Sequence, residues 1–197
     1  RLADGQLLNR YWDDRAVPRT ESWMDDVATA AQAPQRAPSQ VYRDLRAGAE
    51  SGWDFSSRWL AEPSALASIH TTAIVPVDLN SLLFHLERTL AHASGVAKDT
   101  RARRDFKRQA QARQRAINTQ LWDPAQGWYV DRDLQTGHTR PALTAAALFP
   151  LWLDIASKPQ ARRTAAAVEA QLVKQGGLLT TTLTTGQQWD APNGWAP

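Results

Sequence analysis

The chain has 197 residues, of which 43% are hydrophobic and 22% charged, and its formal net charge at pH 7 is +3. These proportions suit one globular unit with a sizeable core, and so mild a charge does not demand a nucleic-acid partner. The lack of cysteine excludes disulfides and thiolate metal sites. Nine tryptophans are many for this length, and such an excess serves carbohydrate-binding surfaces as well as cores.

Apolar runs in the chain are too short to cross a membrane. The best candidate, residues 142–155, is interrupted by Pro150 and Asp154. The first residues lack the basic-then-apolar pattern of a signal peptide, so we expect any targeting segment to lie outside this chain.

Two helices are predicted in the first quarter of the chain. Residues 20–34 favour a helix with Thr20 or Ser22 as its N-cap. Residues 38–52 favour a second helix, with Ser39 as its N-cap.

The end of the second helix leads into GAESGWDFSSRW, residues 48–59. Trp53 and Trp59 flank the carboxylate of Asp54 here, and Gly52 lets the backbone bend. Aromatic faces beside a carboxyl group can hold a sugar ring while its glycosidic oxygen meets an acid. Packing against tryptophan would also favour the protonated form of Asp54. The alternative is a helix boundary, with Asp54 as an N-cap and both tryptophans in the core; this stretch alone favours that alternative.

Two longer helices follow. Asp78 is predicted to cap the first, which ends at Gly95 and carries an apolar stripe. The stripe consists of Leu79, Leu82, Leu83, Leu86 and Leu90. Asp99 or Thr100 is predicted to cap the second, which runs to residues 122–124. Its basic residues suit a solvated outer helix better than a phosphate-binding surface.

The last third of the chain predicts a hairpin and further helices. Residues 127–140 favour a β-hairpin with its turn at residues 135–137. Residues 143–155 favour a buried helix that Pro150 kinks or splits. A final helix is predicted from Pro159 to residues 176–177. Helical pairs without a fixed repeat indicate an all-α architecture, and the scattered histidines predict no metal site.

The final ten residues, QWDAPNGWAP, contain two tryptophans, two prolines and Asp190. Such a loop could be a buried corner or a sugar platform. It matches the second signature of the trehalases, glycoside hydrolases that split α,α-trehalose into two glucoses. SGWDFSSRW, IVPVDLNSLL, TAAALFPLW and GWYVDRDL resemble the same family in the same order. The resemblance covers essentially the whole chain and is greatest to periplasmic members from bacteria.

The resemblance implies an all-α fold, part of an (α/α)6 toroid with a small β-hairpin. It also implies hydrolysis with inversion, by an aspartate acid and a glutamate base, without metal or organic cofactor. Asp54 falls on the acid. The family's Arg-Pro-Glu triplet falls on residues 19–21, where Thr20 departs from the usual proline. The residues implied to bind the sugar are Arg19, Glu21, Gly52, Trp53 and Trp189.

Two motifs of the family do not occur in the sequence: the first signature, of PGGRF type, and the Gly-rich segment that bears the base. We therefore expect residues 1–197 to be the central part of a single catalytic domain, inactive alone. The expected partner is trehalose, bound by a monomeric enzyme in the periplasm, or alternatively the cytoplasm; neither nucleic acid nor membrane is expected. Two alternatives remain: another all-α toroid glycosidase, and a non-catalytic sugar-binding helical domain.

Overall fold

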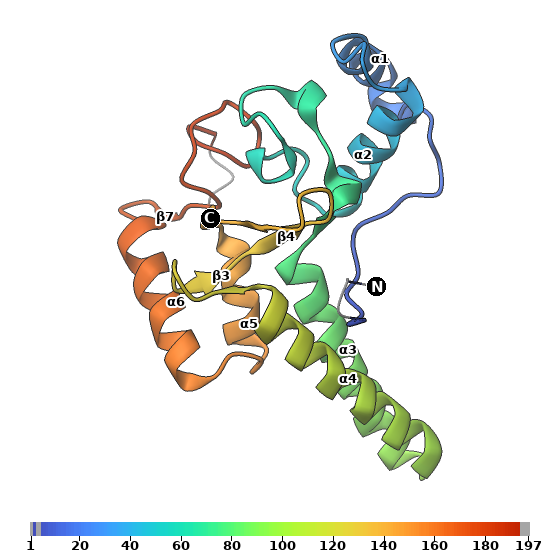
Figure 1. Cartoon of the computed structure of the whole chain (residues 1–197), viewed down its shortest axis with the longest axis vertical. Coiled ribbons are helices and arrows are strands. Elements are labelled where there is room, and N and C mark those ends of the chain that lie inside the picture. The colour runs from blue at the N-terminus through green and yellow to red at the C-terminus, as the bar shows by residue number, and fades with distance from the viewer. Residues whose placement is uncertain (1, 3–4, 194–197) are drawn as a thin grey trace.

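The computed structural model describes residue 2 and residues 5–193. The helices of this part are α1 (Trp23–Ala31), α2 (Pro38–Glu50), α3 (Val77–Val96), α4 (Thr100–Gln120), α5 (Phe149–Trp152) and α6 (Lys158–Gln171). The strands are β1 (Ile74–Val75), β2 (Trp122–Asp123), β3 (Trp128–Tyr129), β4 (Asp131–Asp133), β5 (Thr139–Arg140), β6 (Val173–Lys174) and β7 (Gly177–Leu178). The expected helical architecture with a small hairpin is confirmed (Figure 1).

The strands form three small antiparallel sheets. β4 lies between β1 and β5, with Val75 opposite Arg132 and Asp131 opposite Arg140. The predicted hairpin over residues 127–140 is therefore present as β4 and β5, while β3 pairs with β2. This arrangement ties the hairpin to the segment that leads into α3.

Helices α1 and α2 pack together at one end of the molecule (Figure 1). A single 3-10 turn, Thr20–Ser22, precedes α1, and neither N-cap position in this region makes a side-chain capping bond. In α2 the predicted N-cap is wrong: Ala37 holds that position, and Ser39 lies inside the helix. Pro38 explains the shift, since proline lacks an N–H and is favoured in the first helical turn.

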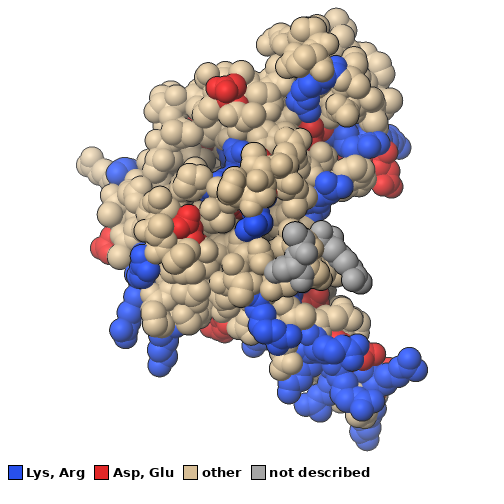
Figure 2. Space-filling model, in the orientation of Figure 1, with Lys and Arg blue, Asp and Glu red and all other residues tan. Residues whose placement is uncertain are grey.

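Helices α3 and α4 form a long hairpin that projects from the rest of the molecule (Figure 1). Asp99 caps α4 as predicted, since its carboxylate accepts the amide hydrogen of Ala102 at 2.9 Å. Asp78 is not the cap of α3, because Pro76 holds that position. Figure 2 shows Lys and Arg side chains gathered over the far end of the hairpin. The exposed members in the first turns of α4 are Arg101, Arg103, Arg104, Lys107 and Arg108.

The buried face of α3 is polar rather than leucine-rich. Leu82 and Leu86 of the predicted stripe are 40% and 49% exposed. Glu87 instead accepts two hydrogen bonds from the guanidinium of Arg113 in α4, at 2.8 and 3.0 Å, and Asn80 accepts a third at 3.1 Å. Periodicity located this helix correctly, but a long-range ion pair decides which face α4 covers.

The predicted helix over residues 143–155 is split, as Pro150 indicated. A 3-10 turn, Ala145–Leu148, leads into α5, and Pro150 lies in the first turn of α5. Ser157 and Gln160 form a capping box at the start of α6. The predicted end of this helix at residues 176–177 is wrong, since α6 ends at Gln171 and β6 and β7 form a hairpin.

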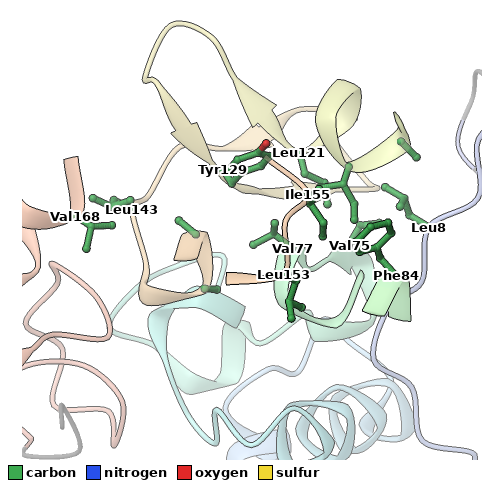
Figure 3. Packing of buried hydrophobic residues seen from close by; sticks show 14 of the residues in the cluster. Leu8, Val75, Val77, Phe84, Leu121, Tyr129, Leu143, Leu153, Ile155 and Val168 are labelled. Carbon is green, nitrogen blue, oxygen red and sulfur yellow. The ribbon is translucent and has the colours of Figure 1, made fainter. Parts of the chain in front are cut away.

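Two hydrophobic clusters make up the core. The larger one joins α3, α4, the hairpins and the α5 region, and Figure 3 shows its members, among them Val77, Leu121, Tyr129 and Ile155. The smaller cluster contains Val41, Leu45, Trp59, Leu60, Ile69 and Ile74. Trp53 packs against both, so the residue beside Asp54 lies where the clusters meet. Across the described ranges, no helix has both the length and the apolar character to cross a membrane.

Candidate functional site

A tight turn after α2 presents Asp54. Gly52 has φ +73°, a left-handed conformation that other residues adopt only with strain, and its N–H bonds the carbonyl of Ala49 at 3.0 Å. The hydroxyl of Ser51 then accepts the amide hydrogen of Trp53 at 3.0 Å. These bonds reverse the chain at the end of the helix. They turn Trp53 and Asp54 out of α2 into an extended segment.

Asp54 is not a helix cap. Ser56 holds the N-cap position of the 3-10 turn Ser57–Trp59, and its hydroxyl accepts the amide hydrogen of Arg58 at 3.1 Å. Asp54 is half-buried. Within the part of the chain that the structure describes, its carboxylate has no hydrogen-bond or ion-pair partner. The capping alternative is therefore wrong, and the carboxyl group remains available for chemistry.

Side chains near Asp54 form a four-layer stack. The Arg58 guanidinium lies 4.5 Å from the ring centre of Trp59 and 4.7 Å from that of Trp53. Trp53 in turn lies 5.9 Å from Trp189, with the two rings tilted by 32°. The stack runs from the buried Trp59 to the half-buried Trp189. It therefore joins the Asp54 segment to the C-terminal loop, two parts of the chain that lie far apart in the sequence.

The Asp54 segment and the C-terminal loop lie side by side (Figure 1). This arrangement corrects one expectation, because Trp59 does not flank Asp54 as a sugar-facing ring. It is fully buried, and its indole N–H donates to the carbonyl of Trp53 at 3.1 Å. The accessible aromatic wall consists of Trp53 and Trp189 instead. Because Trp53 lies between Arg58 and Trp189 in the stack, the ring of this pair that can meet the apolar face of a sugar is that of Trp189, with Trp53 supporting it.

Two buried carboxylates hold Arg58 in place. Its guanidinium donates two hydrogen bonds to Asp78, at 2.7 and 2.9 Å, and two to Asp131, at 2.6 and 2.9 Å. Burial lowers the pKa of this guanidinium, but Asp131 and Asp78 outweigh that effect and hold the pKa well above its usual value. Asp131 also accepts the amide hydrogen of Val77 at 2.9 Å, so the cluster joins α3, β4 and the Asp54 segment.

Sequence reasoning missed Arg58 and the pairing roles of both aspartates. The available signal was a charged residue between two tryptophans, SSRW, together with single aspartates directly after the apolar runs IVPV and WYV. A buried arginine needs carboxylate partners, and these were the candidates. Which carboxylates it pairs with depends on the fold.

Asp190 anchors the C-terminal loop to the same segment. Its carboxylate is 1% exposed and accepts hydrogen bonds from Ser56, Ser57, Thr181 and Thr185. The donors are the hydroxyls of Ser56, Thr181 and Thr185, at 2.9, 2.9 and 2.5 Å, and the amide of Ser57, at 2.8 Å. With four donors around it and almost no exposed surface, this carboxylate fixes the loop rather than reacting with a substrate.

The expected sugar-binding residues are only partly brought together. Arg19 forms a paired contact with Asp26, at 2.7 and 3.1 Å, and its guanidinium lies 4.9 Å from the ring centre of Phe55. The amide of Trp189 donates to the carbonyl of Phe55 at 3.1 Å. Arg19, Trp53 and Trp189 therefore surround the Asp54–Phe55 segment.

Glu21 is exposed, and among the described residues no contact joins it to Asp54. It acts on Arg46, whose pKa is raised mainly by a hydrogen bond to Asp13 and to a lesser extent by the charge of Glu21. Gly52 contributes its backbone turn. Trp195, the second tryptophan of the terminal motif, lies outside the described residues.

A cleft of about 310 Å³ opens beside Arg58 and Asp131. Ser57 and Arg58 line it at one side, Asp133 and Arg140 come from the β4–β5 hairpin, and Thr181 comes from the C-terminal loop. Asp54 is not among its lining residues. The cleft therefore does not enclose the candidate acid.

Replacing Gly48 by Ala is expected to disturb the Asp54 segment. Alanine normally stabilises a helix by about 1 kcal/mol relative to glycine. At Gly48, however, an added methyl group would lie 2.9 Å from the Phe55 ring. We expect the free energy of unfolding to fall by about 1–3 kcal/mol, as it does for overpacked cores, when measured by urea denaturation. Gly95→Ala is the matched control, because its nearest neighbour is the flexible Arg103 side chain at 3.3 Å. Equal effects at both glycines would contradict this packing.

Comparison with known proteins places the chain in a family. The family model named Trehalase matches residues 1–197. The chain is 56% identical over 197 residues to a periplasmic trehalase of Salmonella paratyphi C (strain RKS4594), and equally to a putative periplasmic trehalase of Salmonella typhi. All of this chain is covered in both matches, but it spans only 35% of the length of either relative.

Solved structures agree on the fold. Neutral trehalase Nth1 from Saccharomyces cerevisiae has a TM-score of 0.73 and 23% identity, over 95% of this chain and 40% of that one. A GH63 mannosylglycerate hydrolase from Thermus thermophilus has a TM-score of 0.54 and 19% identity, over 89% of this chain and 36% of that one. The expected fold, part of an (α/α)6 toroid, is confirmed by the first likeness. Because the family model matches every residue, the chain belongs to the trehalase family.

Proposed function

We propose that the protein containing this chain hydrolyses α,α-trehalose into two glucose molecules with inversion, and that Asp54 is its general acid. The observation that carries the proposal is the half-buried Asp54 carboxylate, which no described residue engages, beside the Trp53–Trp189 wall. Family membership supports the same reaction, as do the names of the relatives. Their names also support a periplasmic location.

Inverting hydrolysis needs two carboxyl groups on opposite faces of the sugar. The acid protonates the leaving oxygen while the base activates a water molecule, and the two groups lie about 6.5–9.5 Å apart to make room for it. Asp54 supplies the acid. We assign the base to a part of the enzyme outside residues 1–197, with this chain as the central part of a single catalytic domain. The activity is accordingly proposed for a full-length enzyme.

The stereochemistry of the first products tests this function. Attack with inversion converts one α-linked glucose into the β-anomer, while the leaving glucose keeps the α-configuration. NMR spectra of trehalose incubated with the full-length enzyme should therefore show both anomers in equal amounts before mutarotation. Maltose serves as the comparison substrate. Release of α-glucose alone would contradict inversion, and faster hydrolysis of maltose than of trehalose would favour another toroid glycosidase.

Removing the Arg19 side chain is expected to weaken trehalose hydrolysis. Charge-assisted hydrogen bonds contribute about 1.5–3 kcal/mol each, so kcat/KM should fall about ten- to a hundredfold. Arg19→Ala alone would leave Asp26 buried without its partner, so the change is made in an Asp26→Asn background. Asp26→Asn alone and Arg101→Ala, at an exposed position on α4, are the controls. An equal loss in Arg101→Ala would show that Arg19 does not bind the sugar.

A further inference from the structure

We infer that Arg58 is a positioning residue that sets the Trp53 ring, and with it the aromatic wall, relative to Asp54. This inference rests on the proposed function for its catalytic consequence. Arg58 lines the cleft but is only 4% exposed, and four of its N–H groups donate to Asp78 and Asp131, so it acts through the Trp53 ring and not on the sugar itself. Its role has two parts: the orientation of the guanidinium is fixed, and the fixed guanidinium then orients the ring.

Paired carboxylates fix the guanidinium plane. Asp78 and Asp131 accept four hydrogen bonds along the edges of the group. Bidentate contacts with carboxylates lie in the plane of a guanidinium, so two such contacts on one group prevent its rotation. The edges are occupied in this way, and both faces of the plane remain open for the rings of Trp59 and Trp53.

The fixed plane then orients Trp53. One side of this ring meets Arg58, at 4.7 Å, and the ring of Trp189 lies 5.9 Å away. The backbone of Trp53 is held as well, because its carbonyl accepts the indole hydrogen of Trp59 at 3.1 Å. Asp54 is the next residue, so a change in the position of Trp53 also shifts the candidate acid relative to the wall. Misplacement of reacting groups by about 1 Å can cost about a hundredfold in rate.

Lysine cannot reproduce this arrangement. Its ammonium group keeps the positive charge near Asp78 and Asp131, but it has no plane to lie between two rings and cannot form two bidentate contacts. Arg58→Lys therefore separates the geometry of Arg58 from its charge. Arg113→Lys is the matched control. Arg113 is also buried and paired with a carboxylate, Glu87, at 2.8 Å, and no described aromatic ring stacks on it.

The experiment measures kcat, KM and the near-UV circular dichroism of Trp53 in the full-length enzyme. The contribution of Trp53 is defined by the difference between the wild-type and Trp53→Phe spectra. In Arg58→Lys we expect kcat to fall between about ten- and a hundredfold, KM to change less than kcat, and the Trp53 signal to be lost. In Arg113→Lys both kcat and the signal should stay at their wild-type values.

A second variant keeps the test decisive if Arg58→Lys does not fold. Asp78→Asn retains Arg58 and weakens one of the two carboxylate contacts that hold its guanidinium. Both kcat and the Trp53 signal should therefore fall, by smaller amounts than in Arg58→Lys. Wild-type kcat and signal in Asp78→Asn, or in a folded Arg58→Lys, would overturn the inference. A wild-type enzyme that releases no glucose from trehalose would contradict the proposed function alone. Loss of the Trp53 signal in Arg58→Lys would still support the positioning of that ring.

Discussion

Asp54→Asn is expected to lower kcat for trehalose by about 10²–10⁴, the usual contribution of a general acid, while the protein stays folded. Asparagine has nearly the shape of aspartate but cannot donate a proton to the leaving oxygen. No described residue bonds the Asp54 carboxylate, so the substitution removes no structural contact within this part. The measurement is steady-state release of glucose by the full-length enzyme, with circular dichroism to confirm folding.

Two controls separate acid catalysis from other losses. Glu62→Gln removes an exposed carboxylate nearby in sequence and should leave kcat unchanged. A glucosyl fluoride substrate tests the role itself, because fluoride leaves with little need for protonation. Asp54→Asn should therefore lose much less activity on the fluoride than on trehalose. Near-normal hydrolysis of trehalose by this variant would contradict the assignment, and an equal loss on both substrates would indicate a role other than general acid.

Local sequence signals predicted the elements that depend on local structure. The capping bond joins Asp99 and Ala102, which are three positions apart, and the turn of the hairpin is similarly short-range. The leucine and basic patterns located α3 and α4 because helical periodicity is visible within each segment. The same reasoning indicated an interruption near Pro150, since proline is favoured in the first turn of a helix and Pro150 lies in the first turn of α5.

Long-range pairing explains where these signals failed. Asp78 has the position of a helix cap in sequence, but its partner is Arg58, 20 residues away. Trp59 looks like a partner of Asp54, but the fold buries it beneath Arg58. Asp190 binds Ser56 across 134 residues. One sequence does not reveal such contacts, because nothing in either segment specifies which distant polar group it will meet.

The residues of the candidate site divide in the same way, into those that a local motif suggests and those whose role depends on distant partners. Motif resemblance proposes Asp54, Arg19 and Trp189 as site residues, and the structure brings the segments that carry them into contact. The parts that hold these residues in place are Arg58, Asp131 and Asp190, and their roles depend on burial and on hydrogen bonds between distant segments. A motif can propose a catalytic role for a carboxylate such as Asp54, whereas the structural role of Asp190 becomes visible only with its hydrogen-bond partners.

Asp190→Ala is expected to destabilise the junction between the C-terminal loop and the Asp54 segment. Alanine would leave the buried amide of Ser57 without an acceptor, and an unsatisfied buried donor costs about 1–3 kcal/mol. The hydroxyls of Ser56, Thr181 and Thr185 can rotate toward other acceptors, so their loss should add less. Urea denaturation of the full-length enzyme should show a lower free energy of unfolding, and Asp190→Asn, which keeps one acceptor, should lose less than Asp190→Ala.

The matched control is Asp154→Asn, because the Asp154 side chain is 86% exposed and lies 4.0 Å from Arg88, and asparagine tolerates the positive φ of 59° at this position. Surface ion pairs of this kind contribute at most about 1 kcal/mol, so this variant should unfold close to the wild type. Loosening the loop should also weaken the contact between Trp189 and Trp53, which lowers kcat for trehalose in Asp190→Ala. If Asp190→Ala and Asp154→Asn had the same free energy of unfolding, the four hydrogen bonds to Asp190 would not be what joins the loop to the Asp54 segment.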